Sequence, residues 1–327
     1  FMKSGEALET ASSINTIVFD KTGTLTIGKP VVTDIAAEDA SKLLRIGASL
    51  EAGSRHPLAV AILEKAKERD LTAYDLGRIE THNGRGLSAL WKDEVWYAGS
   101  RKFLEEAGAA CDVYAQQELA WLKQGKTVVW IGTAKKIYGI IAIADQLKPQ
   151  TVDVIRRLRN QHIDVVMLTG DNEITAKAIA ETAGISHVIA QVLPDQKGEE
   201  IKKLQEQGNI VAMVGDGIND AVALTQSEVG IAIGSGSDVA VESADIVLVK
   251  DNIEDVETAI RLSRAVIRNI KQNLFWAFFY NSLGIPVAAG VLHLFGGPLL
   301  SPVFAGAAMA FSSVSVVSNA LRLRNFK

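Results

Sequence analysis

A seven-residue polar segment, Asp20–Thr26, follows directly on the apolar run Ile14–Phe19. The apolar run predicts a buried strand, and the Gly and Thr residues after it predict a turn. Asp20 is therefore expected at the carboxyl tip of a strand, the edge of an open α/β sheet where ligands bind. A carboxylate there can bind a metal ion, act as a base, or attack phosphorus to form an aspartyl phosphate.

Similar polar loops follow two more apolar runs. Thr169, Gly170 and Asp171 follow the run 164–168, and the string Gly-Asp-Gly-Ile-Asn-Asp at 215–220 follows the run 210–214. Further strands are expected at 229–233 and 246–249, and the helical patterns between them are 151–160, 175–183 and 196–207. This alternating order predicts a parallel sheet, whose strands end at one common edge.

The residues at that edge fit the needs of phosphoryl transfer: a nucleophile, Mg²⁺, and donors or cations around the phosphate oxygens. Asp20 fits the nucleophile, and Asp216 with the Thr22 carbonyl would complete a Mg²⁺ shell. Thr169 would donate a hydroxyl and Lys197 would supply positive charge. Any one acidic residue in a Gly-rich turn usually has only the structural role of forming the turn. The candidate catalytic set is Asp20, Lys21, Thr22, Thr169, Gly170, Asp171, Lys197, Asn219 and Asp220.

The stretch from Thr33 to about Ile137 has a different pattern, with helices expected at 41–50 and 57–69 and short strands at 91–97 and 127–131. We expect a separate domain inserted after the first strand, with the parallel sheet resuming at 138–143.

Composition narrows the class of protein. The chain has 327 residues, 48% of them hydrophobic, and a net charge of −4, which gives no case for a nucleic-acid partner. Its single cysteine, Cys111, excludes an internal disulfide. The beginning, Phe1-Met2-Lys3-Ser4, has no leader pattern and reads as a cut through a longer protein.

Residues 272–321 contain no Asp, Glu, Lys or Arg. A Gly- and Pro-containing break at 295–302 divides this stretch into spans of about 274–294 and 303–321, which predict a transmembrane helical hairpin. Basic residues flank both outer ends, so the positive-inside rule places these ends in the cytoplasm. The alternative is a buried helical hairpin of a soluble protein.

The strings Asp-Lys-Thr-Gly-Thr, Thr-Gly-Asp-Asn and Gly-Asp-Gly-Ile-Asn-Asp resemble those of the haloacid-dehalogenase superfamily and, more closely, of P-type ATPases. The resemblance implies a haloacid-dehalogenase-like doubly wound parallel sheet with an inserted α+β nucleotide-binding domain, using ATP and Mg²⁺. The superfamily's phosphatases carry an acid–base Asp two residues after the nucleophile, where this chain has Thr22. Without that carboxyl group, an aspartyl phosphate is expected to persist.

The inserted block resembles the nucleotide-binding domain of the heavy-metal subfamily. By this resemblance His56, with Pro57 after it, would pack against adenine, and Gly84 and Gly86 would let backbone approach the nucleotide. The alternative is that His56 only caps the helix that follows it, which is the more common role of a lone His at such a position. Two residues depart from the family pattern: Arg55 replaces a frequent Glu, and Val222 replaces Pro, which would loosen the segment after the Mg²⁺ loop.

The predicted hairpin contains polar residues that are similar to the signatures of copper(I) transporters in this subfamily. Tyr280 and Asn281 lie in the first span, and Met309 and Ser313 in the second. A thioether suits Cu⁺, so copper is favoured over zinc, cadmium or cobalt, although helix packing would explain either span alone. His293 is expected to be interfacial. The family's Cys-Pro-Cys motif and actuator domain would lie upstream of Phe1.

The resulting hypothesis is ATP-driven copper(I) export through an aspartyl phosphate on Asp20, in a multi-pass cell-membrane protein with cytoplasmic catalytic domains. The expected partners are ATP, copper ion, membrane lipid and a copper chaperone. The expected division is stalk and first part of the phosphorylation domain (1–33), nucleotide-binding domain (34–137), second part of the phosphorylation domain (138–265) and two transmembrane helices (266–327). The alternatives are a membrane-anchored phosphatase of the same superfamily, a pump for zinc or cadmium, and a non-enzymatic nucleotide-binding fragment.

Overall fold

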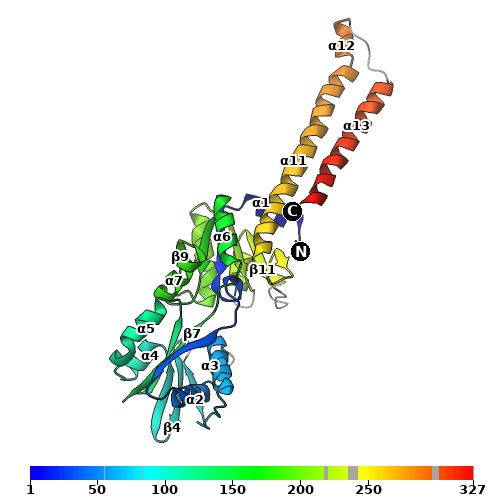
Figure 1. Cartoon of the computed structure of the whole chain (residues 1–327). Helices are drawn as coiled ribbons and strands as arrows, with labels where there is room; N and C mark the ends of the chain where they lie inside the picture. Colours follow the sequence, from blue (N-terminus) through cyan, green and yellow to red (C-terminus); the bar gives the residue numbers. More distant parts are fainter. Residues whose placement is uncertain (55, 83, 217–219, 235–241, 297–301, 327) are drawn as a thin grey trace.

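A computed structural model describes residues 1–54, 56–82, 84–216, 220–234, 242–296 and 302–326 (Figure 1). It contains two six-stranded sheets and a long pair of helices.

The first sheet is parallel throughout and has the order β12-β11-β10-β1-β8-β9. Its central strand, β1 (Thr16–Asp20), lies between β8 (Asp164–Leu168) and β10 (Val211–Gly215). The outer strands are β9 (His187–Ile189), β11 (Val229–Ile233) and β12 (Ile246–Leu248). The prediction of a parallel α/β sheet is confirmed, and the carboxyl ends of the central strands share one edge.

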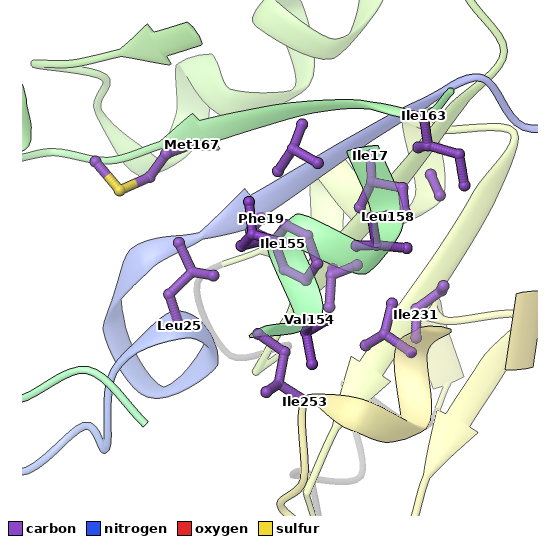
Figure 2. Close-up of a cluster of buried hydrophobic side chains, with 14 of the residues drawn as sticks. Ile17, Phe19, Leu25, Val154, Ile155, Leu158, Ile163, Met167, Ile231 and Ile253 are labelled. Atoms are coloured by element: carbon purple, nitrogen blue, oxygen red, sulfur yellow. The ribbon is translucent and has the colours of Figure 1, made fainter. Parts of the chain in front are cut away.

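Helices cover both faces of this sheet because alternate β1 side chains point to opposite sides. Ile17 and Phe19 belong to one hydrophobic cluster, and Val18 belongs to another. Figure 2 shows the first cluster, in which Ile17 and Phe19 lie beside Leu158 and Ile155 of α6 (Thr151–Asn160). The first face also receives α1 (Gly5–Ser13) and α7 (Glu173–Ala183), and the second receives α8 (Lys197–Glu206) and α9 (Ala221–Gln226).

The second sheet is antiparallel, in the order β2-β7-β6-β5-β4-β3. Its strands are β2 (Val31–Ala37), β3 (Ile79–His82), β4 (Gly86–Trp91), β5 (Glu94–Gly99), β6 (Thr127–Thr133) and β7 (Ile137–Ala144). Helices α2 (Ala40–Leu50) and α3 (Pro57–Glu68) pack on one face, and α4 (Arg101–Glu106) and α5 (Ala115–Leu122) on the other.

Two strand predictions in this region are wrong. The run 138–143 does not rejoin the parallel sheet, because it lies in β7 and pairs antiparallel with β2 and β6. An apolar run is buried equally well in either sheet, so its composition could not decide between them. The expected strand 91–97 is a hairpin, since Lys92 and Asp93 have φ of 52° and 63° and turn the chain between β4 and β5.

The helices α11 (Glu254–Ala288) and α13 (Pro302–Leu321) run side by side and project from the sheet domains (Figure 1). A short helix, α12 (Val291–Leu294), follows α11. The first expected span therefore belongs to a helix that begins much earlier, in the charged part of the chain, and ends at Ala288. Among the described residues, no helix combines the length and apolarity needed to cross a membrane.

Amide side chains join the two long helices at the end nearest the sheets. Asn269 Nδ2 donates to the Asn319 carbonyl at 2.7 Å, and Asn319 Nδ2 donates to Asn273 Oδ1 at 2.9 Å. Asn319 belongs to the last turn of α13, where backbone carbonyls have no partner within the helix. Asn269 therefore satisfies one of these carbonyls and fastens α13 to α11.

Candidate active site

The β1 strand ends at Asp20, a residue that is 6% exposed and whose carboxylate faces a buried lysine. Lys197 Nζ donates to Asp20 Oδ1 at 2.5 Å and to Asp220 Oδ1 at 2.6 Å. Lys197 is the first residue of α8, and Asp220 directly precedes α9. Both helices follow strands of the parallel sheet, so the sheet order brings together residues that are far apart in the sequence.

Burial dominates the electrostatics of this triad. It raises the pKa of Asp20 to about 7, and the Asp220 charge adds to the effect while Lys197 opposes it. Burial alone would lower the pKa of Lys197, but the charges of Asp20 and Asp220 together raise it. Lys197 thus stays an ammonium that two buried carboxylates share, and this leaves an excess of negative charge at the sheet edge.

The loop after β8 adds a second ion pair. Lys21 Nζ lies 2.7 Å from Asp171 Oδ2, and the Asp171 backbone N–H donates to Thr169 Oγ1 at 3.2 Å. Thr169 is 2% exposed, and Gly170 lies between these two residues at the edge of the sheet. The structure therefore brings the predicted Thr169–Asp171 loop next to the Asp20 loop.

The backbone after Asp20 turns sharply at Gly23, which has a φ of 74°. A Cβ atom at Gly23 would come within 3.3 Å of Asp216 Oδ2, so the loop lies against this carboxylate. The predicted Mg²⁺ ligands, Asp20, Asp216 and the Thr22 carbonyl, thus come from adjoining loops. Asn219 lies outside the described residues.

The donor set fits a hard divalent cation. Asp216 raises the pKa of Asp20 further, so two carboxylates repel one another here, and the buried Asp220 Oδ2 has no hydrogen-bond partner in the described structure. Oxygen ligands and unbalanced negative charge are what Mg²⁺ requires. Within the described residues no three His, Cys, Asp or Glu side chains form a metal site alone. The expected shell instead uses two carboxylates and a carbonyl.

A cavity of about 580 Å³ opens from Asp20 toward the antiparallel sheet. Its lining includes Lys21, Thr169 and Lys197 on one side and His56 and Pro57 on the other. His56 Nδ1 accepts a hydrogen bond from the Leu58 N–H at 3.2 Å and so caps α3, whose first residue is Pro57. Burial lowers the pKa of His56, which keeps this imidazole neutral. Both the capping and the ligand interpretations of His56 are thus compatible with its position.

The other predicted nucleotide residues lie apart from this cavity. Gly84 has a φ of 71° in the turn between β3 and β4, and Gly86 begins β4. A Cβ atom on Gly86 would come within 2.2 Å of the Ala98 carbonyl, so this glycine is required by strand packing. Neither is among the described residues that line the cavity. Arg55 is outside the described residues, and the exposed Val222 packs against Gly198.

The predicted copper residues lie on the paired helices, well away from Asp20. Tyr280 and Asn281 lie on α11, where Asn281 Nδ2 donates to the Ala277 carbonyl at 2.9 Å within the same helix. Met309 and Ser313 lie on α13.

Residues 14–227 match the haloacid dehalogenase-like hydrolase family. This match spans more than half of the chain and includes every candidate catalytic residue. The chain belongs to the haloacid dehalogenase-like hydrolases.

Individual proteins that match the chain over its whole length are more specific than this family. A probable copper-transporting ATPase of Synechococcus elongatus is 49% identical over 330 residues, covering 100% of this chain and 44% of that protein. A copper-exporting P-type ATPase of Vibrio cholerae is 48% identical, covering 99% of this chain and 36% of that protein. A zinc-transporting PIB-type ATPase in the E2·Pi state superposes with a TM-score of 0.74 at 35% identity, covering 99% of this chain and 52% of that chain. The chain thus spans less than half the length of these two curated P-type relatives.

Two residues beside the haloacid dehalogenase-like site were not predicted from the sequence. Asp145 accepts from Thr26 Oγ1 at 2.5 Å and from the Gly28 N–H at 3.1 Å, which joins the two segments that link the sheets. Lys148 is 6% exposed and donates to the Gly23 carbonyl at 2.9 Å. The only sequence signal is an Asp and a Lys three residues apart after an apolar run, which is too common to identify a site.

Proposed function

We propose that this chain is the catalytic and C-terminal part of an ATP-driven copper(I) exporter that is phosphorylated on Asp20. The observation that carries the proposal is the position of Lys197 between Asp20 and Asp220, with Lys197 and Asp20 both lining the cavity. The P-type ATPase relatives support the reaction, and the names of the copper relatives support the ion. Because the chain spans only part of these relatives, the activity belongs to a longer protein.

In the proposed reaction an Asp20 carboxylate oxygen attacks the γ-phosphorus of ATP. An O–P bond forms, the bond from phosphorus to the β,γ-bridging oxygen breaks, and ADP leaves with that oxygen. Lys197 holds the nucleophile in place and favours its ionised form, while Thr169 and Lys21 face the phosphate oxygens. Bound Mg²⁺ would neutralise charge between the phosphate and the Asp20 and Asp216 carboxylates.

The persistence of the phosphate follows from Thr22, which places no carboxyl group two residues after the nucleophile. A hydroxyl is a far weaker general base than a carboxylate, so attack by water on the aspartyl phosphate is slow. This property favours a pump, which needs a long-lived phosphoenzyme, over a membrane-anchored phosphatase.

We place the ATP base on the His56 side of the cavity and the phosphates near Asp20. The antiparallel domain then delivers nucleotide to the parallel domain. Since β2 and β7 belong to the antiparallel sheet, we assign 31–144 to the nucleotide-binding domain, in place of the expected 34–137.

We also propose that the pair α11 and α13 is part of a membrane domain, with the catalytic domains in the cytoplasm. Large apolar side chains such as Phe278 and Ile285 are 68% and 67% exposed on α11, which is typical of a surface that lipid or other helices cover. Tyr280, Asn281, Met309 and Ser313 would contact Cu⁺ on its path, and a copper chaperone would deliver the ion.

The nucleophile is tested by incubating the full-length protein with γ-labelled ATP and Mg²⁺. We expect acid-stable, hydroxylamine-labile labelling that Asp20→Asn abolishes, since an amide cannot form the acyl phosphate. Unchanged labelling of Asp20→Asn would refute the assignment. Rapid turnover of small phosphate esters without labelling would favour the phosphatase instead.

The ion is tested by the ATPase rate of the full-length protein with Cu⁺ or Zn²⁺. We expect stimulation by Cu⁺, because thioether sulfur prefers soft monovalent copper, and loss of this stimulation in Met309→Leu. Stimulation by Zn²⁺ alone would assign the chain to zinc pumps, a second candidate that the likeness to the zinc-transporting structure favours.

A further inference from the structure

Helices α1 and α11 meet next to the base of the paired helices (Figure 1). A basic pocket of about 490 Å³ lies at this junction, with Ser12 of α1 in its lining. Arg264, Arg268 and Lys271 line it together with Phe275 and Trp276. It is separate from the cavity at Asp20, and none of the proposed catalytic residues contributes to it.

The cations of this pocket are placed to receive an anion. They are four and three residues apart, so they lie on one face of α11 and repel one another. Arg264 is fixed by bonds to the carbonyls of Ser12 and Ile14, at 3.3 and 3.2 Å. In the part of the chain that the structure describes, no carboxylate forms an ion pair with Arg268 or Lys271, and none lines the pocket.

The neighbouring carboxylate on α11 is already engaged. Glu257 lies 3.2 Å from Arg157 and 3.4 Å from Arg261, and it also accepts from Gln161 at 3.0 Å. It therefore does not offset the charge of the pocket, which remains strongly positive.

Aromatic side chains mark the other end of the pocket. Phe275 and Trp276 are 59% and 44% exposed, with ring centroids 5.5 Å apart. Phe275 follows Lys271 by about 6 Å along the helix, close to the depth of a lipid headgroup layer. Cations at the headgroup level and aromatic rings beside the first acyl carbons match the two parts of a phospholipid.

We propose that this pocket binds the phosphate headgroup of an anionic membrane phospholipid, with the acyl chains lying along Phe275 and Trp276. The proposal rests on the proposed membrane position of α11 and α13. Inorganic phosphate would share the cations but gain nothing from the exposed rings, so we assign the site to lipid.

The test uses the full-length pump in phosphatidylcholine vesicles with and without phosphatidylglycerol, and measures the lipid that remains bound by native mass spectrometry. The paired substitution Arg268→Gln with Lys271→Gln is compared with the pair Arg322→Gln with Arg324→Gln. The second pair removes two cations just after α13 that do not line the pocket. We expect retained phosphatidylglycerol to fall about tenfold to thirtyfold in the first pair alone. Trp276→Leu should lower it less.

Three results would overturn the proposal: unchanged retention in the first pair, equal loss in both pairs, or displacement of the lipid by inorganic phosphate. Lys271→Gln alone replaces the double variant if that variant fails to fold, and phosphoenzyme formation reports folding. The proposed function is judged separately. If Asp20 is labelled but no lipid is retained, the lipid site is refuted and the proposed pump is not. If the protein does not float with vesicles, the proposed membrane position of α11 and α13 is refuted.

Discussion

At the scale of single residues, Lys197 has a structural role in addition to the catalytic role proposed for it. Its side chain is 7% exposed, and its ammonium offsets the charges of Asp20 and Asp220, whose side chains are 9% and 1% exposed. Removing one partner from a buried charge cluster leaves the remaining charge without compensation, which costs more than the net value of the pair.

We expect Lys197→Met to lower the free energy of unfolding by about 3–5 kcal/mol, because it leaves two buried carboxylates uncompensated. We also expect it to abolish phosphate labelling of Asp20 by ATP, because Asp20 loses the cation that favours its ionised form. Chemical denaturation and phosphoenzyme assays would measure the two effects. The matched control is Lys197→Met with Asp220→Asn, which removes one uncompensated carboxylate and should recover part of the stability but none of the labelling. If Lys197→Met alone were as stable as the wild type, the structural role of Lys197 would be contradicted.

The strings around Asp20, Asp216 and Asp220 were sufficient to predict that these residues gather at one sheet edge, because parallel strands end on the same side. The bridging bonds of Lys197 were not predictable in detail, since they depend on how α8 begins relative to β1. For Gly86, by contrast, a role was predicted that the structure explains in another way. Resemblance to the heavy-metal subfamily predicted nucleotide contact for this glycine, whereas the structure explains it by the close approach of the Ala98 carbonyl.

At the scale of elements, the two segments that link the sheets are fastened to the catalytic loop. Asp145 joins them to one another, and Lys148 reaches the Gly23 carbonyl and Asp251. The loop that carries the nucleophile is therefore held from the linker side as well as by its own strand.

We expect Lys148→Met to slow phosphorylation of Asp20 about tenfold to hundredfold with little change in the KM for ATP, because it displaces the loop without touching the nucleotide. Rapid-quench labelling at several ATP concentrations would measure both quantities. Lys135→Met is the control, since this lysine is 81% exposed and pairs only with Glu94. A raised KM with an unchanged rate would assign Lys148 to nucleotide binding.

Element types were predictable from periodicity, and α6 matches its expected bounds. Sheet membership was not. The run in β7 has the same composition as a central parallel strand, and only its pairing with β2 and β6 assigns it to the second sheet. The turn at Lys92 and Asp93 was missed because Lys is unusual at positive φ and no Gly accompanies Asp93, as it does in the common Asp-Gly hairpin turn.

At the scale of the whole molecule, α11 is a single helix of 35 residues that starts against the parallel sheet and continues into the paired helices. Such a helix is about 50 Å long, and as a rigid rod it would transmit a displacement of the parallel domain on the phosphorylation proposed for Asp20.

We expect Ile270→Pro to leave labelling of Asp20 intact and to reduce Cu⁺-stimulated ATPase activity to background, because a kink between the two parts costs about 3 kcal/mol and breaks the mechanical connection. Ile270 is 46% exposed, so Ile270→Ala serves as a control that keeps the helix straight. Retained stimulation in the proline variant would show that another segment carries the coupling.

The central position of β1 has a consequence for how the molecule moves. Hydrogen-bonded neighbours flank this strand on both sides, and its five residues are all buried. Amide protons in such a strand exchange with solvent only when the whole domain opens. The Asp20 carboxylate is thus carried by the segment of the parallel domain that opens last, so the position of this side chain is as stable as the sheet itself.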